Sequence, residues 1–284
     1  MSRLGSSETE KAQPETILFP ATSCEVAVQR WRDGALTQVS DQVAEEVPVA
    51  LTYHGVPHVV MLTTPANLED LAVGFTLSES IVAHRQEIRS VEAAQRDDGS
   101  LEVRIGIAAD RFSELLRRQR NLTGRTGCGL CGAQTVEEAI RNPPPVDRGV
   151  TVDAKALHQA LVDLKRLQEI NARCGSVHAA AWVVPGSGIQ FVREDVGRHN
   201  ALDKTIGAIV RAGGDVASGY FLITSRASYE MVQKAATVGA TFLAAVSAPT
   251  AFAIRLAEAT GLTLVGFARE HQHVIYANPS RLIQ

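Results

Sequence analysis

Two cysteines three positions apart could carry chemistry in this chain. Cys128 and Cys131 lie in the segment RTGCGLCGAQ, whose glycines predict a loop that can change shape and expose a thiol. The residues that follow read as a helix beginning near Ala133, and Arg125 lies just upstream. A helix N-terminus and a guanidinium both favour the thiolate, which is the form of cysteine that attacks sulfur, binds metals and exchanges disulfides. The pair therefore predicts a nucleophilic, redox or metal-binding site.

The sequence around the pair argues against a metal. A zinc site needs two further ligands, and there is no second Cys-x-x-Cys motif. A zinc deaminase places His-x-Glu before Pro-Cys-x-x-Cys, whereas here the pair precedes His178 and follows a glycine. We therefore predict no permanently bound metal. A thioredoxin-like dithiol would follow a strand, and no strong strand precedes Cys128. Disulfide exchange and sulfur transfer through a cysteine persulfide stay open, beside a purely structural turn.

A second polar cluster, REDVGRHNALDKTIG at residues 193–207, follows a predicted strand. Arg198, His199 and Asn200 are donors of different geometry at the turn from that strand into a helix. Such turns bind phosphates and other anions in many α/β proteins. A charged helix start is also typical of a solvated surface, and neither a Walker motif nor GxGxxG is present. The cluster predicts an anion site without support for nucleotide hydrolysis or NAD binding.

The first half of the chain must contain the elements that lead to the cysteines. Residues 1–16 are polar and predict a disordered tail. Four β-rich runs predict two hairpins, 47–53 with 58–64 and 88–94 with 101–107. Helical spacing predicts two helices, at 66–83 and 110–124. We expect residues 17–145 to form a smaller α+β domain that ends in the cysteine loop.

The second half begins with a predicted helix and two predicted strands, at 153–172, 177–184 and 189–195. After them, continuous apolar runs alternate with helical segments, which is typical of a parallel sheet covered by helices. Ligands of such sheets bind beyond the carboxyl ends of the strands. We therefore expect residues 146–284 to form a second, ligand-binding α/β domain. Three segments qualify as ligand loops: 224–228, 246–250 and 267–272.

Composition excludes several function classes. The chain has 284 residues and a formal net charge of −3, which gives no general attraction to nucleic acid or anionic lipid. The first residues lack the apolar core of a signal peptide, and no apolar run reaches the ~18 residues that a membrane span needs. We expect a cytoplasmic protein without nucleic-acid or membrane partners. Its four cysteines are then reactive, metal-binding or buried rather than disulfide-bonded.

Several long segments in a fixed order carry a resemblance to a known family. They are EEVPVALTYHGVPHVVMLTTPANLEDLAVGF, RTGCGLCG, VHAAAW, REDVGRHNALDK, TSRASYEMVQKAATVG and SAPTAFAIRLAEATGLTLVGFAR. From Glu45 to Leu282 the chain resembles the FdhD/NarQ family of formate dehydrogenase accessory sulfurtransferases. The resemblance implies an α/β fold with a cytidine-deaminase-like three-layer αβα C-terminal domain that lacks deaminase chemistry. It also implies a homodimer.

The same resemblance implies a reaction and its partners. Members of the family take sulfur from a cysteine desulfurase and pass it to the molybdenum bis(molybdopterin guanine dinucleotide) cofactor, which they bind as a substrate. Formate dehydrogenase, the client, needs that cofactor in its sulfurated form. Matched position by position, the persulfide residue is Cys128, and Cys131 is its neighbour in the same loop. The cofactor-contacting segment matches residues 267–272, where this chain departs from the expected pattern at Glu270 and His271.

We therefore predict two groups of site residues. The catalytic pair is Cys128 and Cys131. The cofactor-binding residues are Phe267, Ala268, Arg269, Glu270, His271 and Gln272, helped by Arg198, His199, Ser225 and Arg226. Two other function classes stay open, namely an escort that binds the cofactor without handling sulfur and a Cys-x-x-Cys dithiol oxidoreductase. An escort would still activate formate dehydrogenase after Cys128→Ala, whereas a sulfurtransferase would not.

Overall fold

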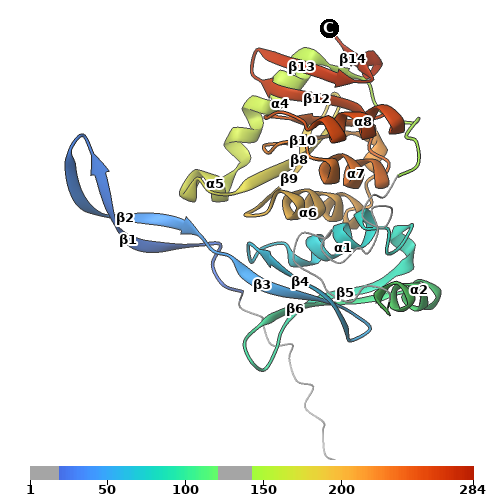
Figure 1. Ribbon diagram of the computed structural model, residues 1–284, viewed down its shortest axis with the longest axis horizontal. Helices are drawn as coiled ribbons and strands as arrows, with labels where there is room; N and C mark the ends of the chain where they lie inside the picture. Colours follow the sequence, from blue (N-terminus) through green and yellow to red (C-terminus); the bar gives the residue numbers. More distant parts are fainter. Residues whose placement is uncertain (1–18, 121–142) are drawn as a thin grey trace, which may run out of the picture.

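The four β-rich runs of the first half form the two predicted hairpins. The strands are β3 (Val47–Tyr53) with β4 (Val56–Thr63), and β5 (Ile88–Gln95) with β6 (Leu101–Ile107). β3 also pairs in parallel with β6, which joins the hairpins into a four-stranded sheet in the order β4-β3-β6-β5. The computed structural model describes residues 19–120 and 143–284. Figure 1 shows this sheet in the lower half of the molecule.

Two helices accompany the four-stranded sheet. α1 (Leu68–Ser78) packs its apolar residues on the sheet, as the helical spacing predicts. It ends before the predicted position because the chain turns at Ser80, whose φ is 53°, and the amide of Ile81 bonds back to Thr76 O at 3.0 Å. After the short 3₁₀ turn η1 (Arg85–Glu87), β5 and β6, the chain forms α2 (Ala109–Arg120). The predicted continuation of α2 to residue 124 lies outside the described residues.

One carboxylate fastens α2 to the turn before β5. Glu87 accepts a hydrogen bond from Arg111 Nε at 2.9 Å and further bonds from the amides of Ala83 and His84, at 2.6 and 3.1 Å. The bond from Arg111, with smaller contributions from the two amides, lowers the pKa of Glu87 to about 2. A depressed pKa means that the stabilisation is present above pH ~4.5 and is lost as the pH falls through about 2.

Glu87→Gln should therefore destabilise the protein at pH 7 by about 1 kcal/mol, a small value because the ion pair is partly exposed to solvent. The difference from wild type should shrink as the pH falls from 4.5 toward 2, because protonated Glu87 and glutamine are both neutral. Urea denaturation at a series of pH values measures this. Glu258→Gln, at an exposed position of another helix, is the control. A pH-independent difference would contradict the assignment.

A long hairpin precedes the four-stranded sheet, and the sequence patterns described above do not predict it. β1 (Ser23–Arg32) and β2 (Ala35–Ala44) pair antiparallel in an unbroken register. Asp33 and Gly34 connect them with φ values of 51° and 83°, which the type I′ hairpin turn requires. The Asp-Gly dipeptide is the sequence feature that could have predicted this hairpin. The flanking residues are mostly polar or exposed, so the burial periodicity that identifies other strands is weak here.

The predicted helix over 153–172 is two helices, α4 (Ala154–Leu167) and α5 (Glu169–Cys174). Asp153 caps α4 by accepting a hydrogen bond from the amide of Ala156 at 2.9 Å. The break follows from a tertiary contact, because the Glu194 carboxylate accepts bonds from the amides of Ile170 and Asn171, each at 2.8 Å. A distant strand thus supplies the anion for the first turn of α5.

The predicted alternation of strands and helices forms a six-stranded sheet in the order β13-β12-β11-β10-β8-β9. β10, β11 and β12 run parallel, as predicted, whereas β8 and β13 run antiparallel to their neighbours. The strands are β8 (His178–Val184), β9 (Gly188–Asp195), β10 (Tyr220–Ile223), β11 (Phe242–Ala245), β12 (Thr263–Arg269) and β13 (Gln272–Ala277). The helices between them are α6 (Arg198–Arg211), α7 (Tyr229–Thr237) and α8 (Ala251–Thr260). Short elements complete the half: β7 (Val152–Asp153), η2 (Val216–Ser218), η3 (Pro279–Arg281) and β14 (Leu282–Ile283).

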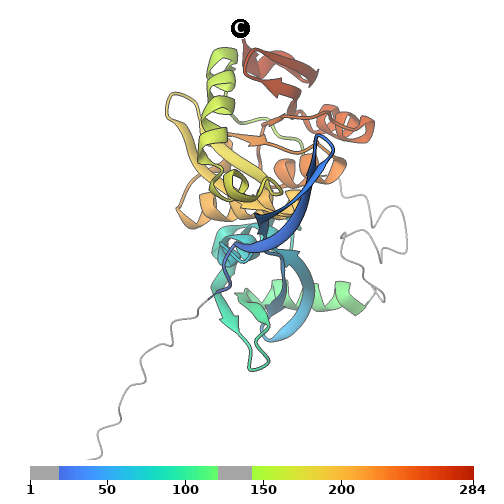
Figure 2. The same cartoon turned by 90° about the vertical axis from the view of Figure 1, so that its left-hand side faces the viewer.

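Both faces of this sheet are covered, which explains its continuous apolar strands. Phe221 and Leu243 point into the core beneath α6, α7 and α8, and Leu222 and Phe242 point into the core beneath α4. Figure 2, turned by 90°, shows α4 on the side of the sheet away from α7 and α8. The structure is thus a mixed α/β fold with several sheets. None of the helices in the described ranges is both long and apolar enough to cross a membrane.

The two halves meet through α1 and α6, which approach closely at two glycines (Figure 1). A Cβ atom on Gly74 would lie 1.7 Å from the backbone oxygen of Asp203, and one on Gly207 would lie 1.9 Å from that of Asp70. Such distances forbid any side chain larger than hydrogen without separating the helices. The glycines therefore set how near the sheet of the first half lies to the N-terminal turn of α6.

Candidate functional site

The carboxyl ends of β9, β10, β11 and β12 meet at one edge of the six-stranded sheet, where α6, α7 and α8 begin. Backbone bonds join the segments there: the amide of Thr250 donates to Ala227 O at 3.0 Å, and that of Phe267 donates to Ser247 O at 3.2 Å. We call this edge the carboxyl rim. It contains the predicted ligand segments 224–228 and 246–250 and the end of β12. The rim is the place where the topology of such sheets puts a ligand.

The predicted ligand loop 267–272 is only partly a loop. Phe267 to Arg269 end β12, Glu270 and His271 form the turn, and Gln272 starts β13. Phe267 has a left-handed φ of 48° within a bulge between β12 and β13, and its side chain is 38% exposed. Ala268 is buried in the core beneath α4. The expectation of a single loop was wrong because β13 pairs with β12 up to Arg269 and Gln272.

Two polar atoms at the rim are buried without a partner. Arg198 Nε, in the first turn of α6, and Ser228 Oγ, the N-cap of α7, have no hydrogen-bond partner among the described residues. Ser228 makes no side-chain capping bond, and Gly197, the N-cap of α6, has no side chain to make one. Buried donors without a hydrogen-bond partner are rare in native proteins, and they usually bind a ligand or a water molecule. Two helix N-termini beside a guanidinium suit an anion.

A close side-chain contact between His199 and Glu230 joins these two helix starts. His199 Nε2 lies 2.7 Å from Glu230 Oε2, and the proximity of His199 lowers the pKa of Glu230. His199 follows Arg198, and Glu230 lies two residues after Ser228, so the pair brings the partnerless atoms to the same junction of α6 and α7. Burial, followed by the positive charges of Arg198 and His199, lowers the pKa of nearby His178. His178 therefore binds a proton less readily than an exposed histidine does.

The other predicted residues of the rim differ in exposure. Ser225 is 5% exposed and donates to the backbone oxygen of Arg226 at 3.1 Å, whereas the Arg226 side chain is exposed. Glu270 and His271 lie farther along the edge, where they border a small cavity with His158 of α4. The structure thus brings Arg198 and His199 together with α7, and it places the 270–271 turn beside α4.

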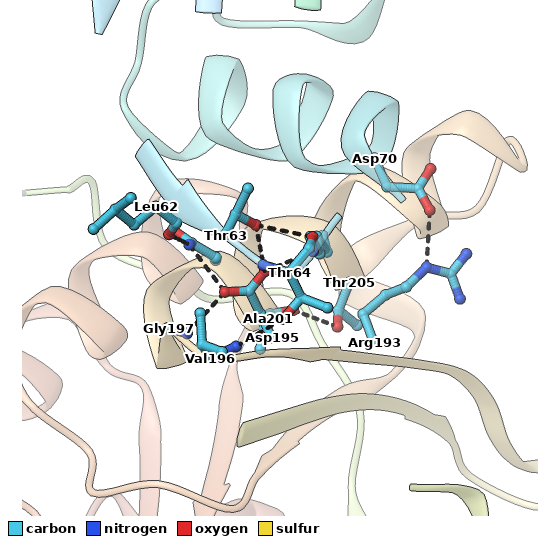
Figure 3. Close-up of polar contacts among 12 residues, drawn as sticks. Leu62, Thr63, Thr64, Asp70, Arg193, Asp195, Val196, Gly197, Ala201 and Thr205 are labelled. Carbon is cyan, nitrogen blue, oxygen red and sulfur yellow. Dashed lines mark hydrogen bonds and ion pairs between the residues drawn. The ribbon is translucent and has the colours of Figure 1, made fainter. Parts of the chain in front are cut away.

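The carboxylate of Asp195 is buried and positions the start of α6. Asp195 belongs to the polar cluster at 193–207 but is not among the predicted site residues. Asp195 Oδ1 accepts hydrogen bonds from the Gly197 amide at 2.8 Å and from Asn200 Nδ2 at 3.0 Å. Asp195 Oδ2 accepts bonds from Lys204 Nζ at 2.6 Å and from the Thr64 amide at 3.1 Å. Figure 3 shows this carboxylate between the end of β4 and the first turns of α6. Asp195 therefore ties the first half of the chain to the rim.

Lys204 and Asp203 in the same cluster are also fully buried, so the interpretation as a solvated helix face was wrong for them. Lys204 Nζ donates to Thr64 O at 2.9 Å in addition to its bond with Asp195. Asp203 Oδ2 lies 2.8 Å from the Nζ atom of Lys234 on α7, which also contacts Glu79 after α1. Helical spacing could have grouped these residues on one face, but their partners lie in distant segments that no local pattern reveals.

Cys128 and Cys131 lie outside the described residues, between α2 and the segment that resumes at residue 143. Of the two cysteines that the structure describes, Cys24 is exposed, and Cys174 donates to Ile170 O at 3.2 Å within α5. Within residues 19–120 and 143–284, no cluster of three or more His, Cys, Asp or Glu side chains could hold a metal ion.

Comparison with known proteins identifies the family. The model of the FdhD/NarQ family matches residues 44–283. The chain belongs to the FdhD/NarQ family. A protein named sulfur carrier protein FdhD, from Cupriavidus necator, is 51% identical over 93% of this chain and 91% of its own length. A protein of the same name from Xanthomonas euvesicatoria is also 51% identical, over 90% of each chain.

A solved structure supports the fold of this FdhD/NarQ member. It is the crystal structure of a candidate formate dehydrogenase accessory protein from Desulfotalea psychrophila. The two structures align with a TM-score of 0.72 over 93% of this chain and all of the other, at 20% sequence identity. The arrangement of sheets and helices is thus shared by a protein that differs at most positions.

Proposed function

We propose that this chain is a sulfur carrier that accepts sulfur on Cys128 and delivers it to the molybdenum cofactor of formate dehydrogenase. The observation that carries the proposal is the match to relatives named sulfur carrier protein FdhD at 51% identity over nearly the whole chain. The Cys-x-x-Cys pair supplies the nucleophile that such a role requires. A cysteine desulfurase is the sulfur donor, and formate dehydrogenase is the client.

Sulfur acceptance is a thiol–persulfide exchange. The Cys128 thiolate attacks the terminal sulfur of the desulfurase cysteine persulfide, and a new S–S bond forms on Cys128. The old S–S bond breaks, and the desulfurase cysteine leaves as a thiolate. No electrons are gained or lost overall, so this step needs no external oxidant or reductant.

Sulfur delivery as sulfide requires two electrons, which Cys131 can supply. The Cys131 thiol attacks the inner sulfur of the Cys128 persulfide, so that a Cys128–Cys131 disulfide forms and hydrosulfide leaves for the molybdenum centre. A cellular dithiol then reduces the disulfide and returns both thiols. This route assigns Cys131 a resolving role. A Cys131→Ala variant that carries and delivers sulfur normally would remove the route but leave Cys128 as the carrier.

We further propose that the guanine dinucleotide part of the substrate binds at the carboxyl rim. The partnerless Arg198 Nε and Ser228 Oγ at the starts of α6 and α7 suit a phosphate group. The chemistry of these donors thus fits a pyrophosphate-containing substrate. Exposed Phe267 offers an apolar surface at the same rim, and Ser225 and Arg226 belong to the adjacent loop. These contacts, the cytidine-deaminase-like description of the second half and the homodimer remain proposals.

Intact mass spectrometry without reductant tests the carrier role. The protein is incubated with a cysteine desulfurase and cysteine, beside Cys128→Ala, Cys131→Ala and the control Cys174→Ala. We expect a gain of one sulfur mass in wild type, Cys131→Ala and Cys174→Ala, and no gain in Cys128→Ala. Sulfur on none of the proteins, with activation of formate dehydrogenase by Cys128→Ala, would support an escort instead. A Cys128–Cys131 disulfide in wild type, together with no persulfide on Cys131→Ala, would support a dithiol oxidoreductase.

A further inference from the structure

Three histidines gather where α4 packs against β12 and β13. His158 lies in the second turn of α4, His273 lies on β13, and His271 lies in the turn between the two strands. Ile275 packs against the core beneath α4, and His273 occupies the alternate position of the same strand, so its side chain faces the same helix. The histidines therefore come together only when the second half of the chain has folded.

The rings of His158 and His273 are close enough to bind one metal ion. His158 Nε2 lies 3.0 Å from His273 Nδ1, and both residues are half-buried. Two nitrogens that bind the same zinc ion at about 2.0–2.1 Å, with tetrahedral angles, lie about 3.3 Å apart. A small rotation of either ring thus converts the hydrogen-bonded pair into two metal ligands.

The pair can release its facing nitrogens to a metal near neutral pH. Metal ions bind the unprotonated nitrogen of a neutral imidazole. Burial, followed by the charges of His273 and His271, lowers the pKa of His158. The ring that donates the hydrogen bond must then carry its hydrogen on the outer nitrogen. This change of tautomer neither takes up nor releases a proton.

A cavity beside the pair offers a third ligand. Its volume is about 230 Å³, and its lining residues are Lys155, His158, Gln159, Val162, Glu270 and His271. The described residues hold no ready-made cluster of three ligands, so a third ligand has to rotate toward the pair. The side chains of Glu270 and His271 are 56% and 88% exposed, which leaves them room to rotate. Glu270 also balances the positive charge that Lys155 brings to the cavity.

We propose that His158 and His273, completed by a side chain of the turn at residues 270–271, form a reversible site for a divalent first-row transition metal such as zinc. Imidazole suits zinc, nickel and copper, whereas magnesium prefers oxygen ligands. A bound ion ties α4 to the turn between β12 and β13. The proposal rests on the geometry of the histidines and does not depend on the sulfur-carrier function.

Isothermal titration calorimetry with zinc chloride at fixed pH tests the pair. The parent protein carries no affinity tag and has its four cysteines replaced by serine, so that no thiolate competes. We expect one zinc ion per chain and no binding of magnesium. His158→Gln and His273→Gln should each weaken zinc binding at least about 10-fold, since even the loss of a partner outside the ligand shell costs that much.

The matched control is His84→Gln, at an exposed histidine outside the cluster, which should bind zinc like the parent. Glutamine still forms hydrogen bonds, so a purely structural histidine pair would leave zinc uptake unchanged in both ring variants. That result would overturn the proposal, because the ion would then bind elsewhere on the surface. A parent protein that takes up no zinc would overturn it as well.

Two further measurements test the third ligand and the role of the imidazoles. Glu270→Gln combined with His271→Gln should weaken zinc binding at least about 10-fold, and unchanged binding would contradict the proposed site. Lowering the pH from about 7.5 to about 5.5 should weaken binding by the parent at least about 10-fold, because protons compete for imidazoles with an ordinary pKa of about 6.5. Binding that does not depend on pH in this range would exclude histidine ligands.

Discussion

Asp195→Ala should lower the free energy of unfolding by about 3–5 kcal/mol, because it leaves the Lys204 ammonium buried without its counter-charge. Both side chains are completely buried, and Lys204 Nζ lies 2.6 Å from Asp195 Oδ2. The same carboxylate accepts hydrogen bonds from Gly197 and Asn200, so its removal also releases the first turn of α6. Urea denaturation followed by circular dichroism measures the change.

Further variants show whether the loss of unfolding free energy in Asp195→Ala comes from the unpaired charge of Lys204. Asp195→Ala combined with Lys204→Met should recover part of the loss, because a buried ion pair replaced by apolar side chains is often nearly neutral. Asp110→Ala, at an exposed position of α2, should change the stability by no more than about 0.5 kcal/mol. A cost below about 1 kcal/mol for Asp195→Ala would mean that the network does not support the junction.

Arg198→Met should weaken the binding of guanosine diphosphate by about 10–100-fold, the range expected for the loss of a hydrogen bond to a charged group. The nucleotide stands for the guanine end of the proposed substrate. Arg198 Nε is buried at the start of α6 without a partner among the described residues, so a phosphate there would gain a bond without displacing another. Methionine keeps most of the side-chain bulk and removes the charge. Isothermal titration calorimetry at fixed salt gives the dissociation constants.

Two controls separate a specific phosphate contact from general charge. Ser228→Ala should weaken binding by only about 2–10-fold, because a neutral hydroxyl makes a weaker bond to phosphate than a guanidinium does. Arg166→Met, on an exposed part of α4, should bind like wild type. If Arg198→Met binds the nucleotide within a factor of about three of wild type, the phosphates lie elsewhere on the rim or do not bind there.

Local patterns in the sequence were enough to predict the main elements of both halves. Alternating apolar residues and a turn signal predicted β5 and β6 around Gly99, whose φ of 82° suits that turn. Continuous apolar runs predicted the parallel strands β10, β11 and β12, because only strands covered on both faces lack polar alternation. Parallel order then placed the starts of α6, α7 and α8 at one edge, together with Arg198 and His199.

By itself, then, the sequence determined most strands and helices of the two halves, the parallel order of β10, β11 and β12, the rim as the place for a ligand, and the cysteine pair as the candidate nucleophile. The tertiary structure alone decided which charges are buried, because Asp195 and Lys204 take partners from β4 and the segment after it. The tertiary structure also divided the helix predicted at 153–172 into α4 and α5 at Gln168, because Glu194 of β9 accepts a hydrogen bond from the first turn of α5. Periodicity reports only whether a position is covered, whereas the partner of a polar group depends on segments brought together by folding.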